Sequence, residues 1–141
     1  MPLIINESTI VKAAGNKEKI IREFFGAVNS GDKDVSIAVM NSPCGWVEPG
    51  QTPEFDEYTV VISGELHIKV KEKEFDIKAG QAVLVRKGEW VQYSTPNEKG
   101  AHYVSVCIPA FTPDKVHRNE EGEQPILSIS SEKKIPSLRG D

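Results

Sequence analysis

Four glycines at positions 45, 64, 80 and 88 punctuate a stretch of the chain that otherwise consists of short runs of strand-forming residues. Tight turns between strands need a positive φ angle or a close approach of two backbones, and glycine allows both. Glycine, proline or asparagine lies in or near most of the breaks between these runs. The runs span residues 35–40, 58–63, 65–70, 74–79, 82–86, 91–94 and 102–108. Many short strands at close, regular spacing predict an antiparallel sandwich or barrel.

Apolar and polar residues alternate within these runs, as they do in a sheet with one buried face and one wet face. Leu66 and Ile68 alternate with His67, so we expect His67 at the surface. The last run leaves the direction open, because either of its two sides can face the interior. Its polar side consists of Tyr103, Ser105 and Cys107.

One segment near the N-terminus carries the apolar spacing of a helix. Between positions 17 and 28, apolar residues recur at the i, i+1, i+4, i+5 and i+8 positions of a helical stripe. These residues are Ile20, Ile21, Phe24, Phe25 and Val28. Asn16 is the expected N-cap and Gly31 the expected stop signal. The pattern predicts a structural helix that closes one side of a barrel.

The length of 141 residues fits a single domain. We expect a strand and helix extension over residues 1–31 and a barrel core over about residues 34–130. The apolar run 126–130 is a candidate for one last strand, and residues 131–141 are expected to form a loose tail.

Charge and cysteine content restrict the class of protein. A net charge of −4 and a pI near 5.4 argue against nucleic acid or an anionic membrane as the main partner. No apolar run has the length of a signal-peptide core or approaches the ~20 residues of a membrane span. Cys44 and Cys107 form no CxxC motif, so neither a disulfide framework nor a zinc knuckle is expected. These features predict a cytoplasmic location.

The glycines belong to two longer spacing patterns. The first is Gly45, five residues, Gln51, one residue, Pro53, three residues, Glu57, six residues and Gly64. The second is Gly80, five residues, Arg86, one residue, Gly88, two residues, Val91, three residues and Thr95. This order resembles the two motifs of the cupin superfamily, G-x5-H-x-H-x3-E-x6-G and G-x5-P-x-G-x2-H-x3-N. The resemblance implies a mainly β fold, a small single-domain, RmlC-like antiparallel jelly-roll barrel, here with one N-terminal helix.

The histidines of the family motifs are missing from this chain. By resemblance, metal ligands would fall at positions 51, 53, 57 and 91. Pro53 and Val91 have no side-chain donor atoms, while Gln51 and Glu57 offer one amide oxygen and one carboxylate. First-row metals in nitrogen and oxygen sites take three or four good ligands, usually imidazoles. We therefore expect no metal and no other cofactor.

Two other histidines leave an alternative open. His102 is expected to be a partly buried structural residue on its strand. His117 lies in a segment that can fold over the mouth of the barrel. A non-standard metal site of Glu57, His102 and His117 therefore stays possible at this level.

Strand alternation, placed in the register of the family, turns one set of side chains toward the interior. The expected ligand-binding residues are Gln51, Phe55, Glu57, Thr59, Val91 and Tyr93. This set makes a mostly apolar cavity with a carboxylate, an amide, a phenol and a hydroxyl, which is the make-up of a small-molecule site. Trp46 and Trp90 are expected to point away from it, toward core or subunit packing.

Glu57 is the central residue of this expected pocket. A carboxylate in a low-dielectric barrel without a metal has a raised pKa unless neighbours donate hydrogen bonds to it. Such a group can act as a general acid or base, or can recognise a cationic or hydroxylated ligand. Alternatively, Glu57 only hydrogen-bonds to Gln51, Tyr93 or a buried water and holds strands together. Glu54 and Asp56 alternate to the other side and are expected in solvent.

Two functions compete on these grounds. The first is a metal-free cupin that binds a polar metabolite, such as a sugar, a sugar acid or an amine, and acts as a sensor or accessory protein. The alternative is a metal-independent isomerase, epimerase or lyase with Glu57 or His117 as base and Tyr93 or Tyr103 as acid. In the family that the chain resembles, sugar epimerases work without metal, and some cupins associated with ethanolamine utilisation also lack the histidines. A homodimer is expected, because small cupins usually associate and open sheet edges invite pairing.

Overall fold

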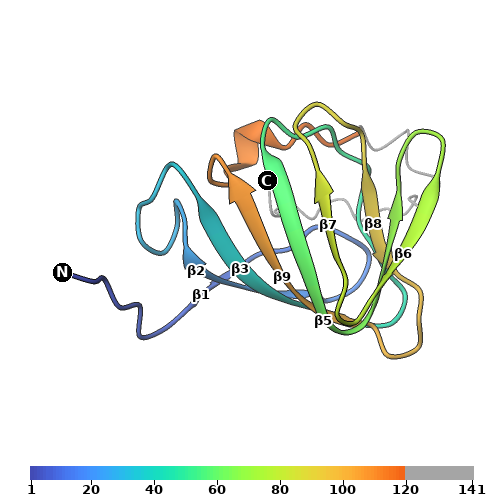
Figure 1. Ribbon diagram of the computed structural model, residues 1–141, viewed down its shortest axis with the longest axis horizontal. Coiled ribbons are helices and arrows are strands. Elements are labelled where there is room, and N and C mark those ends of the chain that lie inside the picture. The colour runs from blue at the N-terminus through green and yellow to red at the C-terminus, as the bar shows by residue number, and fades with distance from the viewer. Residues whose placement is uncertain (120–141) are drawn as a thin grey trace.

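The structure, a computed structural model, describes residues 1–119 as one curled antiparallel sheet (Figure 1). Nine strands and one 3-10 helix make up this part of the chain. The strands are β1 (Thr9–Val11), β2 (Ile20–Phe25), β3 (Ser36–Ser42), β4 (Trp46–Val47), β5 (Asp56–Lys69), β6 (Glu74–Lys78), β7 (Ala82–Val85), β8 (Gln92–Thr95) and β9 (Ala101–Ile108), and the helix is η1 (Pro113–Lys115). The predicted antiparallel jelly-roll architecture is confirmed.

Strand β5 joins the two halves of the sheet. The strand order is β1-β2-β3-β9-β5-β8-β4, and β6 and β7 also pair with β5. Figure 1 shows β3 and β9 on one side of β5 and β7, β8 and β6 on the other. The first half of β5 pairs with β9 and β7, so Glu57 lies opposite Cys107 and Val85. The second half pairs with β6 and β8, so Ile68 lies opposite Phe75 and Tyr93.

Gly64 lies inside β5 rather than between two strands. The runs 58–63 and 65–70, expected as separate strands, are one continuous strand with a register shift between Val61 and Ser63. Gly64 has a φ of 78°, and a Cβ atom added there would lie 2.8 Å from the Cα of Ala101. Glycine therefore lets β5 bend against the start of β9 without ending it.

The prediction of an N-terminal helix is wrong, because residues 20–25 form strand β2. β2 pairs antiparallel with β3, with Ile21 opposite Met40. Ile20, Phe24 and Phe25 are β-branched or aromatic side chains, which suit a strand as well as a helical stripe. Glu23 is a charged residue at a buried position of the strand, so the sequence of β2 lacks the alternation of apolar and polar residues that marks a strand. The Glu23 Oε2 accepts hydrogen bonds from the backbone N–H groups of residues 28 and 29 at 2.9 and 2.8 Å.

The core lies between the two halves of the curled sheet. Trp46, Leu66, Ile68, Val61 and Val91 are each no more than 1% exposed. Burying a side chain of this size contributes about 1.5–3 kcal/mol of transfer free energy. The indole N–H of Trp46 donates to the carbonyl of Ala14 at 2.9 Å. Trp46 is thus a core residue, one of the two alternatives expected for it.

Strand β9 turns its polar side inward. Ala101, Tyr103, Ser105 and Cys107 are buried, while the alternate residues, His102, Val104, Val106 and Ile108, are half-buried or exposed. The sequence left open which side of this strand faces the interior, and the structure shows that it is the side with Tyr103, Ser105 and Cys107. The outward side of β9 is the more apolar one, and so is the outward side of the first half of β5, with Tyr58, Val60 and Ile62 exposed.

Two further expected features, a last strand and a tail, concern the C-terminal end of the chain. Residues 126–130 and the tail 131–141 lie outside the described residues. Within residues 1–119, no helix is long and apolar enough to cross a membrane. Cys44 is exposed and Cys107 is buried, and no disulfide joins them.

Candidate functional site

The residues expected to bind a ligand all lie on the buried side of the sheet. Glu57 is 5% exposed and alternates with exposed Tyr58 on β5, so its carboxylate faces the interior. The other five expected residues, Gln51, Phe55, Thr59, Val91 and Tyr93, are each 5% exposed or less. Thr59 Oγ1 lies 3.4 Å from the hydroxyl oxygen of Ser105 on neighbouring β9. The fold therefore brings the expected set to one interior surface.

Tyr93 is a buried phenol that lies within electrostatic range of Glu57. It lies on β8 opposite Ile68 of β5 and is buried. Burial raises the pKa of the Tyr93 phenol well above its ordinary value, and the negative charges of Glu57 and then Glu48 add to the rise. The group is therefore a neutral O–H at physiological pH. Within residues 1–119, the Tyr93 Oη has no hydrogen-bond partner although it is buried.

Glu48 is a second interior carboxylate, and sequence reasoning missed it. It is 3% exposed, and its backbone N–H donates to the carbonyl of Tyr93 at 3.2 Å. Glu48 falls among the five residues between Gly45 and Gln51, which the motif treats as a spacer. The residues Trp46, Val47 and Glu48 show no alternation of apolar and polar residues, so the sequence held no signal for the burial of Glu48.

Gln51 sits between two neighbouring segments. It forms an antiparallel bridge with Val91 on one side and with Arg118 on the other. Its side-chain Oε1 accepts a hydrogen bond from Arg118 Nη1 at 3.2 Å. Sequence reasoning missed Arg118, because no motif covers this polar, turn-rich region. Only the idea that the segment folds over the barrel mouth pointed toward it.

The expected catalytic partner His117 lies elsewhere. Its side chain is 50% exposed, and its Nε2 contacts the carboxylate of Glu54 at the surface. Glu54 and His117 are thus paired on the outer side, apart from Glu57. Tyr103, the alternative acid, is buried, and its hydroxyl lies 3.0 Å from the Ser42 hydroxyl. Glu57 and Tyr93 are both buried, and the charge of Glu57 acts on the Tyr93 phenol.

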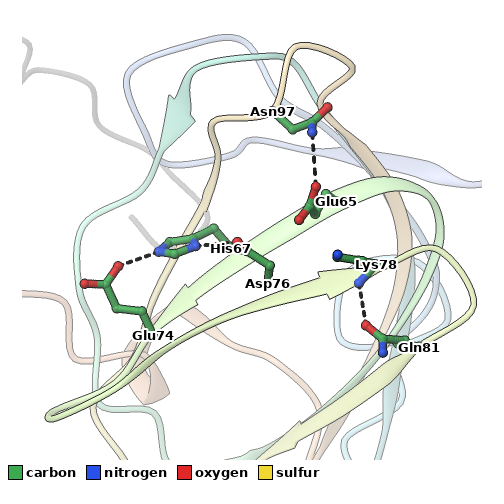
Figure 2. A network of polar contacts seen from close by, with 7 residues as sticks. All are labelled: Glu65, His67, Glu74, Asp76, Lys78, Gln81 and Asn97. Atoms are coloured by element: carbon green, nitrogen blue, oxygen red, sulfur yellow. Dashed lines mark hydrogen bonds and ion pairs between the residues drawn. The ribbon is translucent and has the colours of Figure 1, made fainter.

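His67 belongs to an outer polar cluster, as expected for a surface residue. Figure 2 shows its ring between two carboxylates of β6. Nδ1 lies 2.7 Å from Asp76 and Nε2 lies 2.7 Å from Glu74. Burial alone lowers the pKa of His67, but the hydrogen bonds to Asp76 and then Glu74, with their charges, raise it overall above 6.5. This cluster tethers β6 to β5 and does not reach the interior set.

A groove of about 910 Å³ lies between the turn that joins β5 to β6 and the loop that joins β7 to β8. It is lined by Thr52, Lys69, Val70, Lys71, Glu72, Lys73, Gly88, Glu89 and Trp90. None of the six expected ligand-binding residues belongs to this lining. Trp90, expected in core or subunit packing, is half-buried and lines this groove, and its indole N–H donates to Asn119 Oδ1 at 3.2 Å.

Comparison with known proteins identifies the family. The cupin domain family matches residues 43–107, which contain both glycine motifs and all six expected ligand-binding residues. The chain belongs to the cupin superfamily. As a cupin it has solved structural neighbours, among them the polyketide cyclase RemF of Streptomyces resistomycificus, with a TM-score of 0.69, 16% identity and 89% of each chain covered. The EutQ protein of Clostridium difficile matches with a TM-score of 0.53 and 22% identity, over 66% of this chain and 64% of that one. At these identities the likeness shows the fold.

One curated relative of this cupin is closer in sequence. A Myxococcus xanthus protein named endoribonuclease YbeY is 43% identical over 99 residues, which is 70% of this chain and 34% of that protein. The cupin chain therefore spans about a third of the length of the curated relative that it matches.

The family's metal position does not fit a metal in this cupin. Val91 is 0% exposed and packs in the apolar core, and buried Pro53 offers no side-chain donor. A carboxylate and an amide are too few ligands for a first-row cation. Among residues 1–119, no group of three or more histidine, cysteine, aspartate or glutamate side chains is arranged to hold a metal. Glu57, His102 and His117, the open alternative, are not brought together, since His102 and His117 both face outward.

Proposed function

We propose that this cupin binds a small polar metabolite, such as a sugar, a sugar acid or an amine, without a metal. The pocket is centred on Glu57, and the domain acts as a sensor or accessory module. The observation that carries the proposal is the buried pair of Glu57 and Tyr93 on the inner wall of the barrel.

The Tyr93 hydroxyl supports a polar ligand. A buried donor left without a partner costs roughly 1–3 kcal/mol. The Tyr93 Oη is buried and has no partner within residues 1–119. A hydroxyl, carboxylate or amine of a bound metabolite would accept or donate at this atom. The phenol stays protonated because burial and the charge of Glu57 raise its pKa. It therefore acts as a neutral hydrogen-bond donor that is fixed in position by β8.

Apolar residues close the wall around this polar pair. Phe55 and Cys107 form one buried cluster with Phe111 and Val116 from the segment after β9. The rings of Phe55 and Phe111 meet edge to face, with centroids 5.8 Å apart. Small-molecule sites combine apolar walls of this kind with a few placed polar groups. The same wall strengthens the electrostatic effect of Glu57 on a bound ligand, because it excludes water.

The relatives support a binding role. The fold shared with EutQ supports a small-molecule-binding cupin. In the Myxococcus xanthus relative, the part that matches this cupin is 34% of a longer protein, which suits an accessory domain beside other domains. We propose the accessory role for this chain on that basis, and we do not extend the ribonuclease activity to it.

A metal-independent isomerase, epimerase or lyase is the second candidate. The observation in its favour is the neighbouring position of a carboxylate and a neutral phenol, Glu57 and Tyr93, which can serve as base and acid. His117 does not take part in this version, because it pairs with Glu54 at the surface.

We also propose that two copies associate through the outer face of the sheet. Tyr58 lies between Leu84 and Val106, and Val60 lies between Ala82 and Val104. Tyr58, Val60, Ile62 and Ile108 are 41–51% exposed, and none of them carries a charge. Contiguous exposed apolar surface marks protein–protein contacts, and a two-fold dimer places the same face of each copy together. The apolar face supports this contact more directly than the open edges considered from the sequence.

A ligand screen observed by NMR tests the binding proposal. Sugars, sugar acids and amines are added to the ¹⁵N-labelled protein, and backbone amide shifts are followed. We expect a binding compound to perturb β5 and β8 around Glu57 and Tyr93. The proposal fails if no compound perturbs these strands, or if perturbations are confined to the outer face or to the groove that Trp90 lines.

A further inference from the structure

The groove between the β5–β6 turn and the β7–β8 loop is a concave surface separate from the interior set. Its volume of about 910 Å³ lies within the range of roughly 300–1,000 Å³ that is typical of small-molecule sites. Figure 1 shows this turn and this loop at the same end of the sheet. Thr52 and Trp90 line the groove, and they are chain neighbours of buried Gln51 and Val91. The groove thus borders the expected pocket in sequence but is lined by different side chains.

Three exposed lysines contribute positive charge to this groove. Lys69 ends β5, and Lys71 and Lys73 follow it in the turn to β6. The Val70 N–H donates to the carbonyl of Lys73 at 2.9 Å, which closes the turn and keeps the three lysines near one another. Among residues 1–119, no salt bridge joins any of the three to a carboxylate. Their ammonium groups are therefore not neutralised by this part of the chain.

Two glutamates of the lining do not cancel this charge. Glu89 Oε1 accepts the backbone N–H of Arg86 at 3.1 Å and so serves its own loop. Glu72 lies in the turn with a lysine on either side of it in sequence. Three lysines against two glutamates leave the lining positive, although the whole chain carries a net charge of −4. A local excess of one sign raises the local concentration of ligands of the opposite sign.

Trp90 gives the same groove a flat aromatic surface. Its indole N–H donates to Asn119 Oδ1 at 3.2 Å. The backbone of Gly50 lies against the ring, since a Cβ atom added to Gly50 would lie 2.3 Å from Cζ2 of Trp90. Glycine permits this close approach. The ring is half-buried and lines the groove. Aromatic rings held in this way favour stacked or edge-to-face contact with another ring.

We propose that this groove is a second ligand site of the cupin, and that it binds a small molecule in which an anionic group is attached to a flat ring. The lysine ammonium groups bind the anion, a phosphate or a carboxylate, through charge-assisted hydrogen bonds. Trp90 packs against the ring. The inference is independent of the interior pocket, because none of the six expected ligand-binding residues lines the groove.

Phenyl phosphate is the probe for this site. It is titrated into the ¹⁵N-labelled protein and compared with benzoate, inorganic phosphate and phenol. We expect saturable shifts of the backbone amides of residues 69–73 and 88–90 and of the Trp90 indole signal. Phenyl phosphate should bind about tenfold more tightly than inorganic phosphate, because the ring contact adds to the charge contact. Benzoate shows whether a carboxylate serves as well as a phosphate. The proposal is overturned if neither ring-bearing anion gives saturable shifts, or if uncharged phenol binds as tightly as they do.

Lysine variants test whether the charge acts locally. The double variant Lys69→Gln, Lys73→Gln should weaken phenyl phosphate binding about tenfold. The matched control is Lys12→Gln, Lys99→Gln, which alters the net charge of the protein equally but at exposed lysines outside the groove. The control should change the affinity less than about twofold, because these charges are distant and screened by salt. Equal weakening by the two double variants overturns the proposal, since the attraction would then come from the charge of the whole protein.

Discussion

Gly100 fills the space that a side chain on Gly64 would need: its carbonyl oxygen and the Cα of Ala101 lie against the position of a Gly64 Cβ atom. The contact joins the bend of β5 to the start of β9 and so holds the two halves of the sheet in their curled arrangement.

Gly64→Ala is therefore expected to destabilise the protein strongly. The new Cβ meets backbone atoms that cannot move aside, and the φ of 78° strains any side chain. Together these effects should cost about 2–5 kcal/mol of unfolding free energy. Gly80→Ala is the matched control, because Gly80 has a φ of 89° but no atom within 4 Å of its Cβ position. It should cost about 1 kcal/mol. Urea unfolding of both variants measures the difference, and equal losses would contradict the close approach.

Tyr93→Phe separates a ligand contact from a structural one. The Tyr93 hydroxyl is buried without a partner in residues 1–119, so removing it should leave the ligand-free protein as stable or up to about 1 kcal/mol more stable. Affinity for the metabolite should fall about tenfold, as for one lost hydrogen bond of about 1.4 kcal/mol. Thermal unfolding with and without ligand checks both effects. A clear loss of stability without ligand would assign the hydroxyl a structural role instead.

The motif glycines and the buried position of Glu57 could be predicted from the sequence, whereas strand β2 and the position of Arg118 could not. The glycines at positions 45, 64, 80 and 88 all have positive φ, and such positions are visible as motif glycines. Alternation correctly turned Glu57 inward. It failed for β2, because Glu23 takes a buried position of the strand, where its carboxylate accepts bonds from the backbone of residues 28 and 29 in the turn that follows. Arg118 was missed for a different reason, since its pairing with Gln51 joins segments 67 residues apart.

The His67 cluster predicts a pH-dependent contribution to stability. The pKa of His67 is raised above 6.5 in the folded state by its bonds to Asp76 and Glu74. Its contribution is therefore fully present below the unfolded pKa near 6.5 and is lost as the pH rises through the folded pKa. His67→Gln should cost up to about 1 kcal/mol at pH 6 and almost nothing at pH 9.

The control for His67 lies in the same network (Figure 2). Glu65 accepts a hydrogen bond from the neutral amide of Asn97 at 3.1 Å. Glu65→Gln should give a difference from the parent protein that stays constant between pH 6 and 9. Urea unfolding across this range is the measurement, and a constant difference for His67→Gln would refute the charged pairing.

If two copies associate through the apolar outer face, a single charged side chain introduced into that face should dissociate the dimer. The parent protein should elute with light-scattering mass twice the chain mass of 15.6 kDa. Val60→Lys places a charge in the centre of the apolar face and should give monomers. Phe75→Lys is the control, because Phe75 is also 45% exposed but lies on β6, away from this face. A monomeric parent, or a dimer that survives Val60→Lys, speaks against this interface.

Binding without a metal is tested most directly by ligand-induced thermal shifts on protein kept in excess EDTA. A bound metabolite stabilises the native state, so at 100 times its Kd the gain is about 2.7 kcal/mol, a shift of several degrees. We expect a sugar, sugar acid or amine to raise the Tm under chelation. Glu57→Gln should abolish the shift, and Glu54→Gln, which alters an exposed carboxylate, should retain it. A shift that requires added metal, or one that survives Glu57→Gln unchanged, would contradict the account.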